Sequence, residues 1–397
     1  MEPEFDILIL GAGLVGSSLA IALEGRGFRV GLLESSLPGI APPGFDERKL
    51  ALADASINAL RALEVLDDAS TLGPIRRIHV SRAGDFGAVR LRAQDWGREA
   101  FGAVIPASQL GAALERRLAT LADLRLIRPA TVTGIETQPD FVRVHVLRSG
   151  VAQALEARLL VAADGTKSFA RTALGIGTDE HDYRQVLLVC SLAADRPADG
   201  TAYERFTNDG PVALLPMGRD YGAICAVAAE QADAIGALDD TDFVEYFQRR
   251  FGWRAGRLLR AGRRSAYPIA RVVADRQVSG RTVLVGNAAQ TIHPIGAQGF
   301  NLGLRDALTL AQGLDPADPG SDAGLARYVE DRREDRERTM AFSDGLARLT
   351  SNPSFALQVG RSFGLLALSH VPGLTAPMVA GAMGYRGKVP ELARKTP

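Results

Sequence analysis

The chain has 397 residues, which is too many for one small core and enough for two interleaved domains or one large domain. Hydrophobic residues make up 46% and charged residues 23%, as in ordinary globular proteins. Lys plus Arg equal Asp plus Glu at 46 each, so there is no bulk attraction to a polyanion, and nucleic acid is not expected as a partner.

The N-terminal residues predict a strand, a helix and a second strand. Residues 6–10 (DILIL) form a short apolar run typical of a buried strand, and residues 14–25 carry apolar positions on one helical face. Residues 29–34 (RVGLLE) return to a strand pattern, which completes a βαβ unit. Acidic Glu2 and Glu4 lead directly into the first strand, so we expect no cleavable signal peptide.

The turn between the first strand and the helix carries a dinucleotide-binding pattern. A GxGxxG motif permits a tight turn, close approach of the backbone to a pyrophosphate and close packing of helix on strand. The helix start also offers free N–H groups to the phosphates. Glu34 closes the second strand 18 residues after Gly16, where a carboxylate can accept hydrogen bonds from both ribose hydroxyls. The residues of the turn and helix start are Gly11, Gly13, Leu14, Val15 and Gly16. This combination favours dinucleotide binding over an ordinary glycine turn in an α/β core.

Two helices and a strand are predicted next. Residues 47–63 (ERKLALADASINALRAL) show near-3.6 apolar spacing, and residues 108–121 (SQLGAALERRLATL) show it again, with Ser108 as the expected N-cap. Residues 158–165 (RLLVAADG) are typical of a strand that ends in an acidic turn at Asp164.

A second set of short strands follows and predicts an inserted antiparallel sheet. These strands cover residues 186–193, 201–206, 211–216 and 221–229. Cys190 and Cys225 lie within them and are expected to be small buried hydrophobes. The chain then returns to the first domain with the strand RTVLVG, and past Arg305 it becomes helical. The charged run at 331–338 (DRREDRER) is interpreted as a solvated helix face.

The predicted fold is α/β. We expect a Rossmann-like nucleotide-binding domain, an inserted antiparallel-sheet substrate domain and a helical C-terminal tail. The nucleotide-binding domain takes 1–75, 100–180 and 268–345, the substrate-binding sheet domain takes 76–99 and 181–267, and the tail takes 346–397.

Two further turns at strand ends make the pattern specific. Asp164-Gly165 lies in VAADGTKSFAR, and Gly286-Asn287 opens the loop of VLVGNAAQTIHPIGAQGFNLGLRDA. The set GxGxxG with a distant Glu, then ADGxxSxxR, then the HP and NLGxRDA helix resembles the class A flavoprotein monooxygenases, typified by para-hydroxybenzoate hydroxylase. Within that group, GNAAQT-HP with GFNLG is most similar to the ubiquinone-biosynthesis hydroxylases of the 2-polyprenyl-6-methoxyphenol type. The resemblance covers residues 5 to about 345.

The resemblance implies an FAD site built from all of these turns. Glu34 corresponds to the adenosine-ribose acid, Arg48 to an arginine beside the flavin and pyrophosphate, and Gln109 to a residue that contacts the cofactor from the side. The full set of expected cofactor contacts is Gly11, Gly13, Leu14, Val15, Gly16, Glu34, Arg48, Gln109, Asp164, Gly165, Gly286, Asn287, Gly299, Phe300 and Asn301. Lys167 and Arg171 are expected to be structural or solvated.

Pro294 and His293 are neighbours with different expected roles. A lone histidine beside a proline is most often a hydrogen-bonded loop residue, and no second metal ligand accompanies it, so neither catalysis nor a metal site is expected of His293. Pro294 resembles the family proline whose carbonyl faces the substrate side of the flavin, and it is the one catalytic candidate. Two positions depart from the broad family: Asn287 replaces an aspartate and Gln290 a histidine. The loop also reads IGAQG where AGQG is typical.

The implied reaction is hydroxylation of an electron-rich phenol ring. NAD(P)H reduces FAD transiently, O2 adds to the flavin, and the resulting C4a-hydroperoxide delivers oxygen to a polyprenylated phenol. The N–H groups of the helix that begins near Gln298 are expected to stabilise negative charge on the reduced flavin. Another aromatic substrate or ring position remains open, as does a non-catalytic, FAD-bearing scaffold subunit of a biosynthetic complex.

A prenyl tail would require an apolar channel. Leu187, Phe206, Leu215 and Tyr221 are candidates to line it, although ordinary core positions explain them equally well. Residues 362–385 carry no Asp, Glu, Lys or Arg but contain Pro372 and Pro377, which disfavours a spanning helix. Two short buried helices are one interpretation. The other is a surface that meets the membrane or other ubiquinone-biosynthesis proteins, in a cytoplasmic protein peripheral to the inner membrane.

Overall fold

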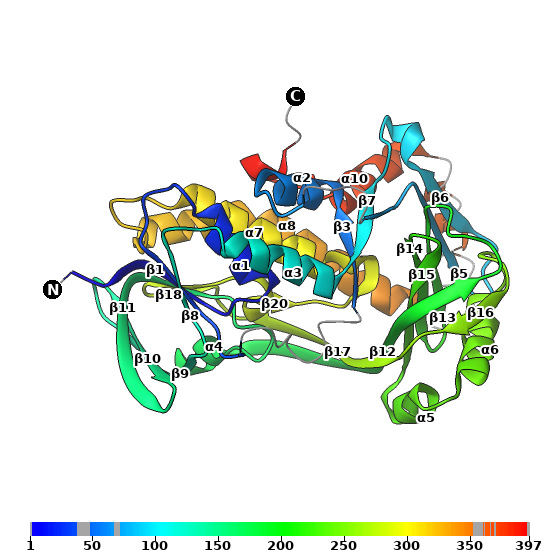
Figure 1. Ribbon diagram of the computed structural model, residues 1–397. Helices are drawn as coiled ribbons and strands as arrows, with labels where there is room; N and C mark the ends of the chain where they lie inside the picture. Colours follow the sequence, from blue (N-terminus) through cyan, green and yellow to red (C-terminus); the bar gives the residue numbers. More distant parts are fainter. Residues whose placement is uncertain are drawn as a thin grey trace.

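The computed structural model describes residues 2–37, 48–66, 72–351, 360, 362–365, 367–368 and 371–394. Its ribbon divides into a helix-covered sheet that contains the N-terminal strand and a second large sheet that carries α5 and α6 (Figure 1). The helical bounds are α1 Leu14–Ala22, α2 Asp54–Ala62, α3 Ala107–Leu118, α4 Phe169–Ala173, α5 Ala232–Gly236, α6 Asp240–Phe251, α7 Gln298–Gly313, α8 Asp322–Ser351 and α10 Pro372–Ala382. Single 3₁₀ turns are η2 Ala93–Trp96, η3 Ala229–Gln231, η4 Gly286–Ala288, η5 Ile295–Ala297 and η6 Glu391–Ala393.

The first sheet has a parallel centre, as the βαβ pattern predicts. Its strand order is β18-β19-β11-β1-β2-β8, and β9 and β10 extend β11 as an antiparallel ribbon. The strands are β1 Phe5–Leu10, β2 Val30–Leu33, β8 Leu124–Ile127, β9 Thr131–Thr137, β10 Val142–Arg148, β11 Val151–Ala162, β18 Val278–Ser279 and β19 Thr282–Leu284. All residues of β1 and β2 are buried, because α1, α3 and α7 cover one face of this sheet (Figure 1) and apolar residues of β9 and β10 pack on the other.

The second sheet is antiparallel except for one pair. Its order is β20-β17-β12-β15-β14-β13-β5-β6, with β16 beside β12, and β13 runs parallel to β5 because β5 arrives from an earlier part of the chain. The strands are β5 Arg77–Arg82, β6 Ala88–Arg92, β12 Thr178–Ala194, β13 Thr201–Thr207, β14 Gly210–Met217, β15 Asp220–Ala228, β16 Leu258–Ala261, β17 Ser265–Ala274 and β20 Gln290–Thr291. Cys190 and Cys225 are buried in its core without a disulfide, as small hydrophobic residues, as predicted.

A small third sheet corrects one sequence prediction. It contains β3 Lys49–Ala53, β4 Gly73–Pro74 and β7 Gly102–Pro106 in the order β3-β7-β4. The segment 47–63 was predicted as one helix, but its first half is β3, and α2 begins only at Asp54. Pairing of β3 with β7 supplies backbone hydrogen bonds that override the helical preference of its Ala and Leu residues. The predicted N-cap at Ser108 is also wrong, since α3 begins at Ala107 after Pro106.

The charged run on α8 is the second correction, because part of it is buried against α7. Arg332 donates to Asp306 (Nε to Oδ1, 2.7 Å) and to Asp335 (2.8 Å), and Arg305 donates to Asp335 at 2.7 Å. These four side chains are at most 2% exposed. The run 331–338 is therefore only partly a solvated face. Its buried charges pair with Arg305 and Asp306, which belong to the NLGLRDA motif.

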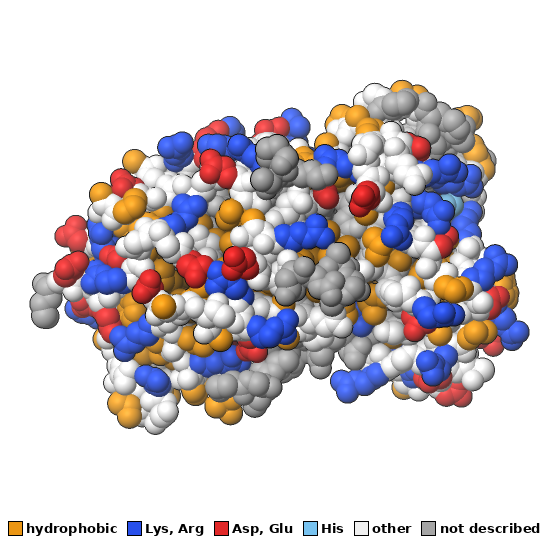
Figure 2. Space-filling model, turned by 45° about the horizontal axis from the view of Figure 1, so that its top comes forward, with side chains coloured by type: hydrophobic (Ala, Val, Ile, Leu, Met, Phe, Trp, Pro, Cys, Tyr) orange, Lys and Arg blue, Asp and Glu red, His pale blue; other side chains and the backbone are white. Residues whose placement is uncertain are grey.

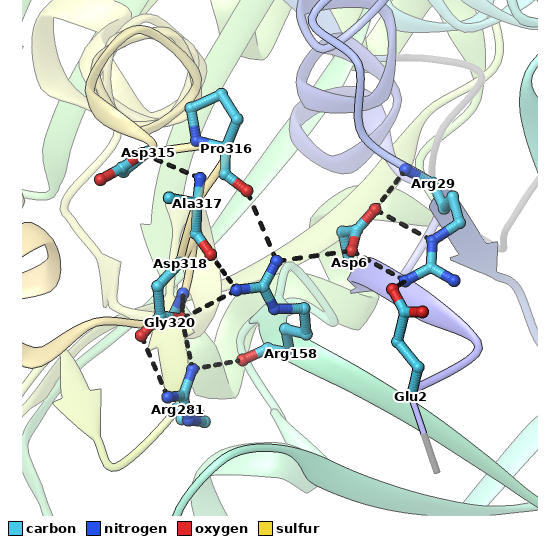
Figure 3. A network of polar contacts seen from close by, with 10 residues as sticks. All are labelled: Glu2, Asp6, Arg29, Arg158, Arg281, Asp315, Pro316, Ala317, Asp318 and Gly320. Atoms are coloured by element: carbon cyan, nitrogen blue, oxygen red, sulfur yellow. Dashed lines mark hydrogen bonds and ion pairs between the residues drawn. The ribbon is translucent and has the colours of Figure 1, made fainter.

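A second polar network ties the start of the chain to the loop that follows α7 (Figure 3). Asp6 accepts hydrogen bonds from both the backbone and side chain of Arg29, and Arg281 forms a bidentate pair with Asp318 at 2.7 and 3.1 Å. Arg158 lies between them and donates to the carbonyl of Ala317. The network joins residues near the amino ends of β1, β2 and β19, at the opposite end of these strands from the glycine turn.

Candidate active site

The glycine turn and Glu34 lie together at the carboxyl ends of β1 and β2. The Gly11 N–H donates to the carbonyl of Leu33 at 2.9 Å, and the Ala12 N–H donates to Glu34 Oε2 at 2.9 Å. The Ser36 N–H donates to Glu34 Oε1 at 2.8 Å. The carboxylate is thus held by backbone donors on both oxygens, half-buried beside the turn, as a ribose-binding acid requires.

The glycines of the turn leave room where a phosphate would approach and none elsewhere. A β carbon at Gly16 would come 1.9 Å from the carbonyl oxygen of Gly11, and one at Gly11 would come 2.7 Å from the carbonyl oxygen of Ala163. At Gly13, which caps α1, a β carbon would meet no atom within 4 Å. Gly165 and Gly299 are open in the same way. The tight positions pack backbone on backbone, and the open ones fit a dinucleotide cradle.

Arg48 and Gln109 are brought together by the β3–β7 pairing. The Ala107 N–H donates to the Arg48 carbonyl at 2.8 Å, which places Arg48 beside the first turn of α3, where Gln109 is exposed. The Arg48 guanidinium lies 5.7 Å from the centre of the Tyr267 ring, and burial lowers the pKa of Arg48. The arginine nevertheless directly precedes β3 rather than lying within the predicted helix.

The second turn, Asp164-Gly165, lies beside the third. Asp164 Oδ2 accepts from the Ala170 N–H at 3.0 Å, whereas its Oδ1 is buried with no hydrogen-bond partner among the described residues. Arg171 links the two turns, because it donates to the carbonyls of Ala288 (3.0 Å) and Thr166 (2.8 Å). Arg171 is therefore structural, as expected, and the orphaned oxygen fits a site that an additional hydroxyl-bearing group completes.

The third turn presents Asn287 outward and packs Gly286 inward. Gly286 has a left-handed φ of 58° and lies against Val15 of α1, where a β carbon would come within 3.1 Å of the Val15 side chain. Asn287 is exposed, while its neighbour Gln290 is buried and bridges Asp306 (2.6 Å) and Arg336 (2.8 Å). The amide at 290 is therefore part of the buried network beneath the loop.

The loop between His293 and α7 has an unusual backbone. Gly296 and Ala297 both have left-handed φ angles, 70° and 51°, and for Ala297 this is a strained conformation. Asn301 stabilises the bend: its amide donates to the carbonyls of Ala51 and Ala297, each at 2.9 Å, and its oxygen accepts from the Ala53 N–H at 2.9 Å. Because the protein uses every polar atom of this side chain, Asn301 positions the loop and the start of α7.

His293 is a buried structural residue, in agreement with the sequence interpretation. Its Nδ1 accepts from the Ile295 N–H at 3.2 Å, and its ring packs edge-on against Tyr183. Burial lowers the pKa of His293 to about 4, so the imidazole is neutral near pH 7. Pro294, next to it, lines the main cavity.

A largely apolar cavity of about 310 Å³ lies between this loop and the second sheet. Leu187 and Leu215 line it, as proposed from the sequence, but Phe206 and Tyr221 do not belong to its lining and pack in neighbouring cores. A further wall comes from the C-terminal segment, through Leu365, Leu368, Met378, Val379 and Ala382. The uncharged stretch was predicted as buried helices or an exposed docking surface, and its role as a cavity wall was missed.

Glu204 is a cavity residue that sequence reasoning missed. It is the acidic side chain among the described residues that line the cavity, and it accepts a hydrogen bond from the Gly296 N–H. Burial raises the pKa of Glu204 to about 7, although the Gly296 bond works in the opposite direction. The signal was present in TAYERFT (201–207), where every second residue should face an apolar interior and one of them is Glu.

Comparisons with known proteins agree with this geometry. A family model described as an FAD-binding domain matches residues 4–343. Ubiquinone hydroxylase UbiL of Rhodospirillum rubrum is 34% identical over 402 residues, which cover 98% of this chain and 92% of the relative. The 3-demethoxyubiquinol 3-hydroxylase of Escherichia coli is 28% identical over 96% of this chain and 98% of its own length. The crystal structure of p-nitrophenol 4-monooxygenase PnpA from Pseudomonas putida has a TM-score of 0.79 at 18% identity, covering 98% of this chain and 100% of that one.

Proposed function

The chain belongs to the FAD-binding domain family and is an FAD-dependent monooxygenase, and from this premise we propose that it hydroxylates the aromatic ring of a polyprenylated phenol in ubiquinone biosynthesis. NAD(P)H and O2 are the co-substrates of the proposed reaction. The observation that carries the choice of substrate is the apolar cavity at the loop that precedes α7.

The residues proposed to hold FAD lie on three turns that the fold brings to one edge of the first sheet. Glu34 binds the adenosine ribose, the N–H groups at Gly13 and the start of α1 bind the pyrophosphate, and Asp164 Oδ1 accepts a hydroxyl of the cofactor. When bound, FAD supplies the reduction by NAD(P)H and the activation of O2. The free N–H groups at the start of α7 favour negative charge at that end of the helix.

The cavity supports a lipid-like phenol as the substrate. Pro294, Gly296 and Gln298, beside which a ring would meet the cofactor, line the cavity together with aliphatic side chains of the second sheet and the C-terminal segment. An apolar enclosure holds the ring by the hydrophobic effect and excludes water from the reacting atoms. The Pro294 carbonyl remains the proposed ring-side contact from this loop.

The proposal includes a peripheral contact with the membrane, from which a prenylated substrate would arrive. Phe86 and Phe363 are 65% and 59% exposed, and their rings pack edge-to-face with centres 5.5 Å apart. The two belong to the β5–β6 turn and to the segment that also supplies the cavity wall residues Leu365 and Leu368. Hydrophobic side chains gather at the upper right of Figure 2, where the described part of this segment lies. Among the described residues, no helix combines the length and apolarity needed to span a bilayer.

The quinone-intermediate profile of cells that lack the protein tests the proposed function. We expect a prenylated phenol that lacks one ring hydroxyl to accumulate, and the wild-type chain to restore the pool. Gly16→Ala should fail to restore it, because a β carbon at Gly16 overlaps the Gly11 carbonyl and closes the turn. Gly345→Ala on α8, where a β carbon meets no atom within 4 Å, is the matched control. A normal ubiquinone pool in the deleted cells would refute the assignment.

Vesicle flotation tests the membrane contact separately. Phe86→Ser with Phe363→Ser should reduce co-flotation with liposomes made of anionic and zwitterionic phospholipids, because each exposed ring loses its burial in the interface. Trp253→Ser, at a side chain that is 68% exposed beyond α6, is the control for a loss of exposed aromatic surface. Equal flotation of the wild type and the double variant would contradict the contact.

A further inference from the structure

Glu204 lines the cavity from β13, where its cross-strand neighbours are apolar. Ala202 and Tyr203 of the same strand also line the cavity, whereas Arg205 is not among the lining residues. The cross-strand partners of Glu204 are Val80 on β5 and Ala213 on β14. The carboxyl group therefore interrupts an apolar wall formed by three adjacent strands.

Among the described residues, one donor, the Gly296 N–H, acts on the pKa of Glu204, and no cation does. From α8 the cavity receives Thr339, Phe342 and Leu346, of which Thr339 is polar but uncharged. The basic group among the described lining residues is Arg386, and the charges that act on its pKa are Asp335, Arg305, Arg338 and Glu334. Arg386 thus interacts with the α7–α8 side of the cavity, and Glu204 has capacity for another hydrogen bond from within it.

Glu204 lies beside the loop before α7 that is proposed to face the flavin. This position allows its carboxyl group to take part in the reaction. Gly296 lies between Pro294 and Gln298, so the hydrogen bond from Gly296 fixes the carboxyl group against the segment where the substrate ring and the cofactor are proposed to meet. A buried carboxylate without a protein cation is costly unless a donor reaches it. A phenol hydroxyl is a neutral donor of the kind that fits an otherwise apolar cavity.

We propose that Glu204 is a catalytic residue that binds the phenol hydroxyl of the substrate and removes its proton during oxygen transfer, an inference that rests on the proposed function. As the new carbon–oxygen bond forms, the phenol O–H bond breaks, the proton passes to the Glu204 carboxylate, and the O–H electron pair enters the ring. The transferred oxygen comes from O2, and the electron pair of the broken O–O bond leaves with the other oxygen atom. When the hydroxylated ring carbon loses its hydrogen to solvent, Glu204 returns its proton to the substrate oxygen and is regenerated.

The raised pKa of Glu204 suits this exchange, because a group that titrates near neutral pH can both accept and return a proton. Only the carboxylate form acts as the base. Hydroxylation should therefore increase as the pH rises through the pKa of Glu204 and level off above it. Arg386 and the buried, neutral His293 face other parts of the site, so neither is expected to produce this acid limb.

The test compares Glu204→Gln with the wild-type holoenzyme on a short-chain prenylated phenol, from acid to alkaline pH. The variant keeps the shape of the side chain and an oxygen for the Gly296 N–H. We expect its hydroxylation rate at alkaline pH to fall by roughly 100-fold, within the range for lost general-base catalysis. Its acid limb should disappear, and more NAD(P)H should be consumed to form H2O2 than product. Glu180→Gln, which removes an exposed acid on β12, should behave as the wild type.

The outcomes separate the two proposals. If the wild type shows no phenol-dependent hydroxylation at all, the proposed function fails. If the wild type hydroxylates the phenol and Glu204→Gln keeps the same rate, coupling and acid limb, the role of Glu204 fails. If Glu204→Gln does not retain FAD, Glu204→Asp is used, and its withdrawn carboxylate should shift the acid limb and lower the coupling. An unchanged limb and coupling in Glu204→Asp would equally overturn the assignment.

Discussion

Glu204 affects stability as well as the proposed chemistry. Its pKa of about 7 in the folded chain lies above the value of roughly 4.3 expected for an unfolded glutamate. The folded state therefore binds the extra proton between these values, and its contribution to stability is complete below the lower pKa and lost as the pH rises through the higher one. The cavity site is thus least stable at the pH where Glu204 is proposed to act as a base.

The first prediction concerns this pH dependence in the enzyme without substrate. Glu204→Gln should raise the melting temperature relative to the wild type above about pH 7, and the gain should shrink towards acid pH, where the wild-type side chain is already neutral. Thermal melts across the pH range measure it. Glu180→Gln, at an exposed acid, should give no pH-dependent gain. A gain for Glu204→Gln that is the same at every pH would contradict the assigned pKa shift.

Single residues also show how far a local sequence pattern reaches. The patterns around Gly16, Glu34 and the Asp164-Gly165 turn fix a backbone geometry, and the structure brings these residues to one edge of the first sheet. Their contacts with the cofactor stay predictions. Glu204 was missed because an acid in a strand is ordinarily a solvated residue. Only the alternating pattern of its strand indicated that Glu204 faces the interior. Its contact with Gly296 is visible only in the folded structure.

At the scale of elements, the α7–α8 pair depends on buried charges that balance one another. Burial raises the pKa of Asp335, but Arg305 and Arg332 outweigh that effect and hold the pKa of the carboxyl group below its usual value. Arg332 also donates to Asp306, which accepts from Gln290 at 2.6 Å. Because the loop that contains Gln290 leads to the cavity, the network supports the proposed ring-binding loop from beneath.

The second prediction removes one charge from this network. Asp335→Asn should destabilise the protein by about 3 to 5 kcal/mol, because it leaves Arg305 and Arg332 buried without their shared partner. Chemical denaturation with the free energy extrapolated to water measures it. Glu337→Gln, two residues further along α8 and exposed, should change the free energy of unfolding by less than about 0.5 kcal/mol. A similarly small effect of Asp335→Asn would show that the network does not hold the helices together.

Element prediction from sequence failed for identifiable reasons. The run at 331–338 has the composition of a solvated helix, and nothing local reveals that Arg305 and Asp306 will face it from α7. The segment 47–63 has helical spacing throughout, yet the pairing of β3 with β7 across a long loop converts its first half to a strand. The βαβ unit and the strands β12 to β15 were predicted because burial of particular faces of these elements imposes a recognisable apolar periodicity on their sequences.

At the scale of the whole molecule, the cavity is assembled from segments distant in the sequence. The first sheet's domain gives it Leu52 and Pro294, the second sheet gives it Leu187 and Glu204, and the C-terminal segment closes it with Val379. Tyr385 anchors that last segment: its hydroxyl donates to Asp54 at 2.7 Å and accepts from Asn58 at 3.0 Å, both on α2. The sequence does not predict that the C-terminal segment closes the cavity, because no periodic pattern in that segment indicates what it packs against.

The third prediction loosens the anchor. Tyr385→Phe removes both hydrogen bonds and should cost about 1 to 2 kcal/mol of stability. It should leave FAD binding unchanged but increase the fraction of NAD(P)H that is spent on H2O2, because water gains access to the cavity. Tyr246→Phe, which loses a hydrogen bond to Arg250 on α6, serves as a control away from the cavity. Equal coupling in Tyr385→Phe and the wild type would contradict the closing role of the segment.

The strand order of the first sheet also determines when the protein can acquire its cofactor. β1 pairs with β11 (Phe5 with Ala157), and β11 pairs in turn with β19 (Leu160 with Thr282). The N-terminal βαβ unit therefore leaves the ribosome long before the strands that complete its sheet, and α7 is translated later still. At typical elongation rates, some 300 residues take roughly 15 to 60 s to synthesise. The edge of β1 stays unpaired for about half of that interval, until β11 is made, and the proposed FAD site is complete only after α7 has been translated.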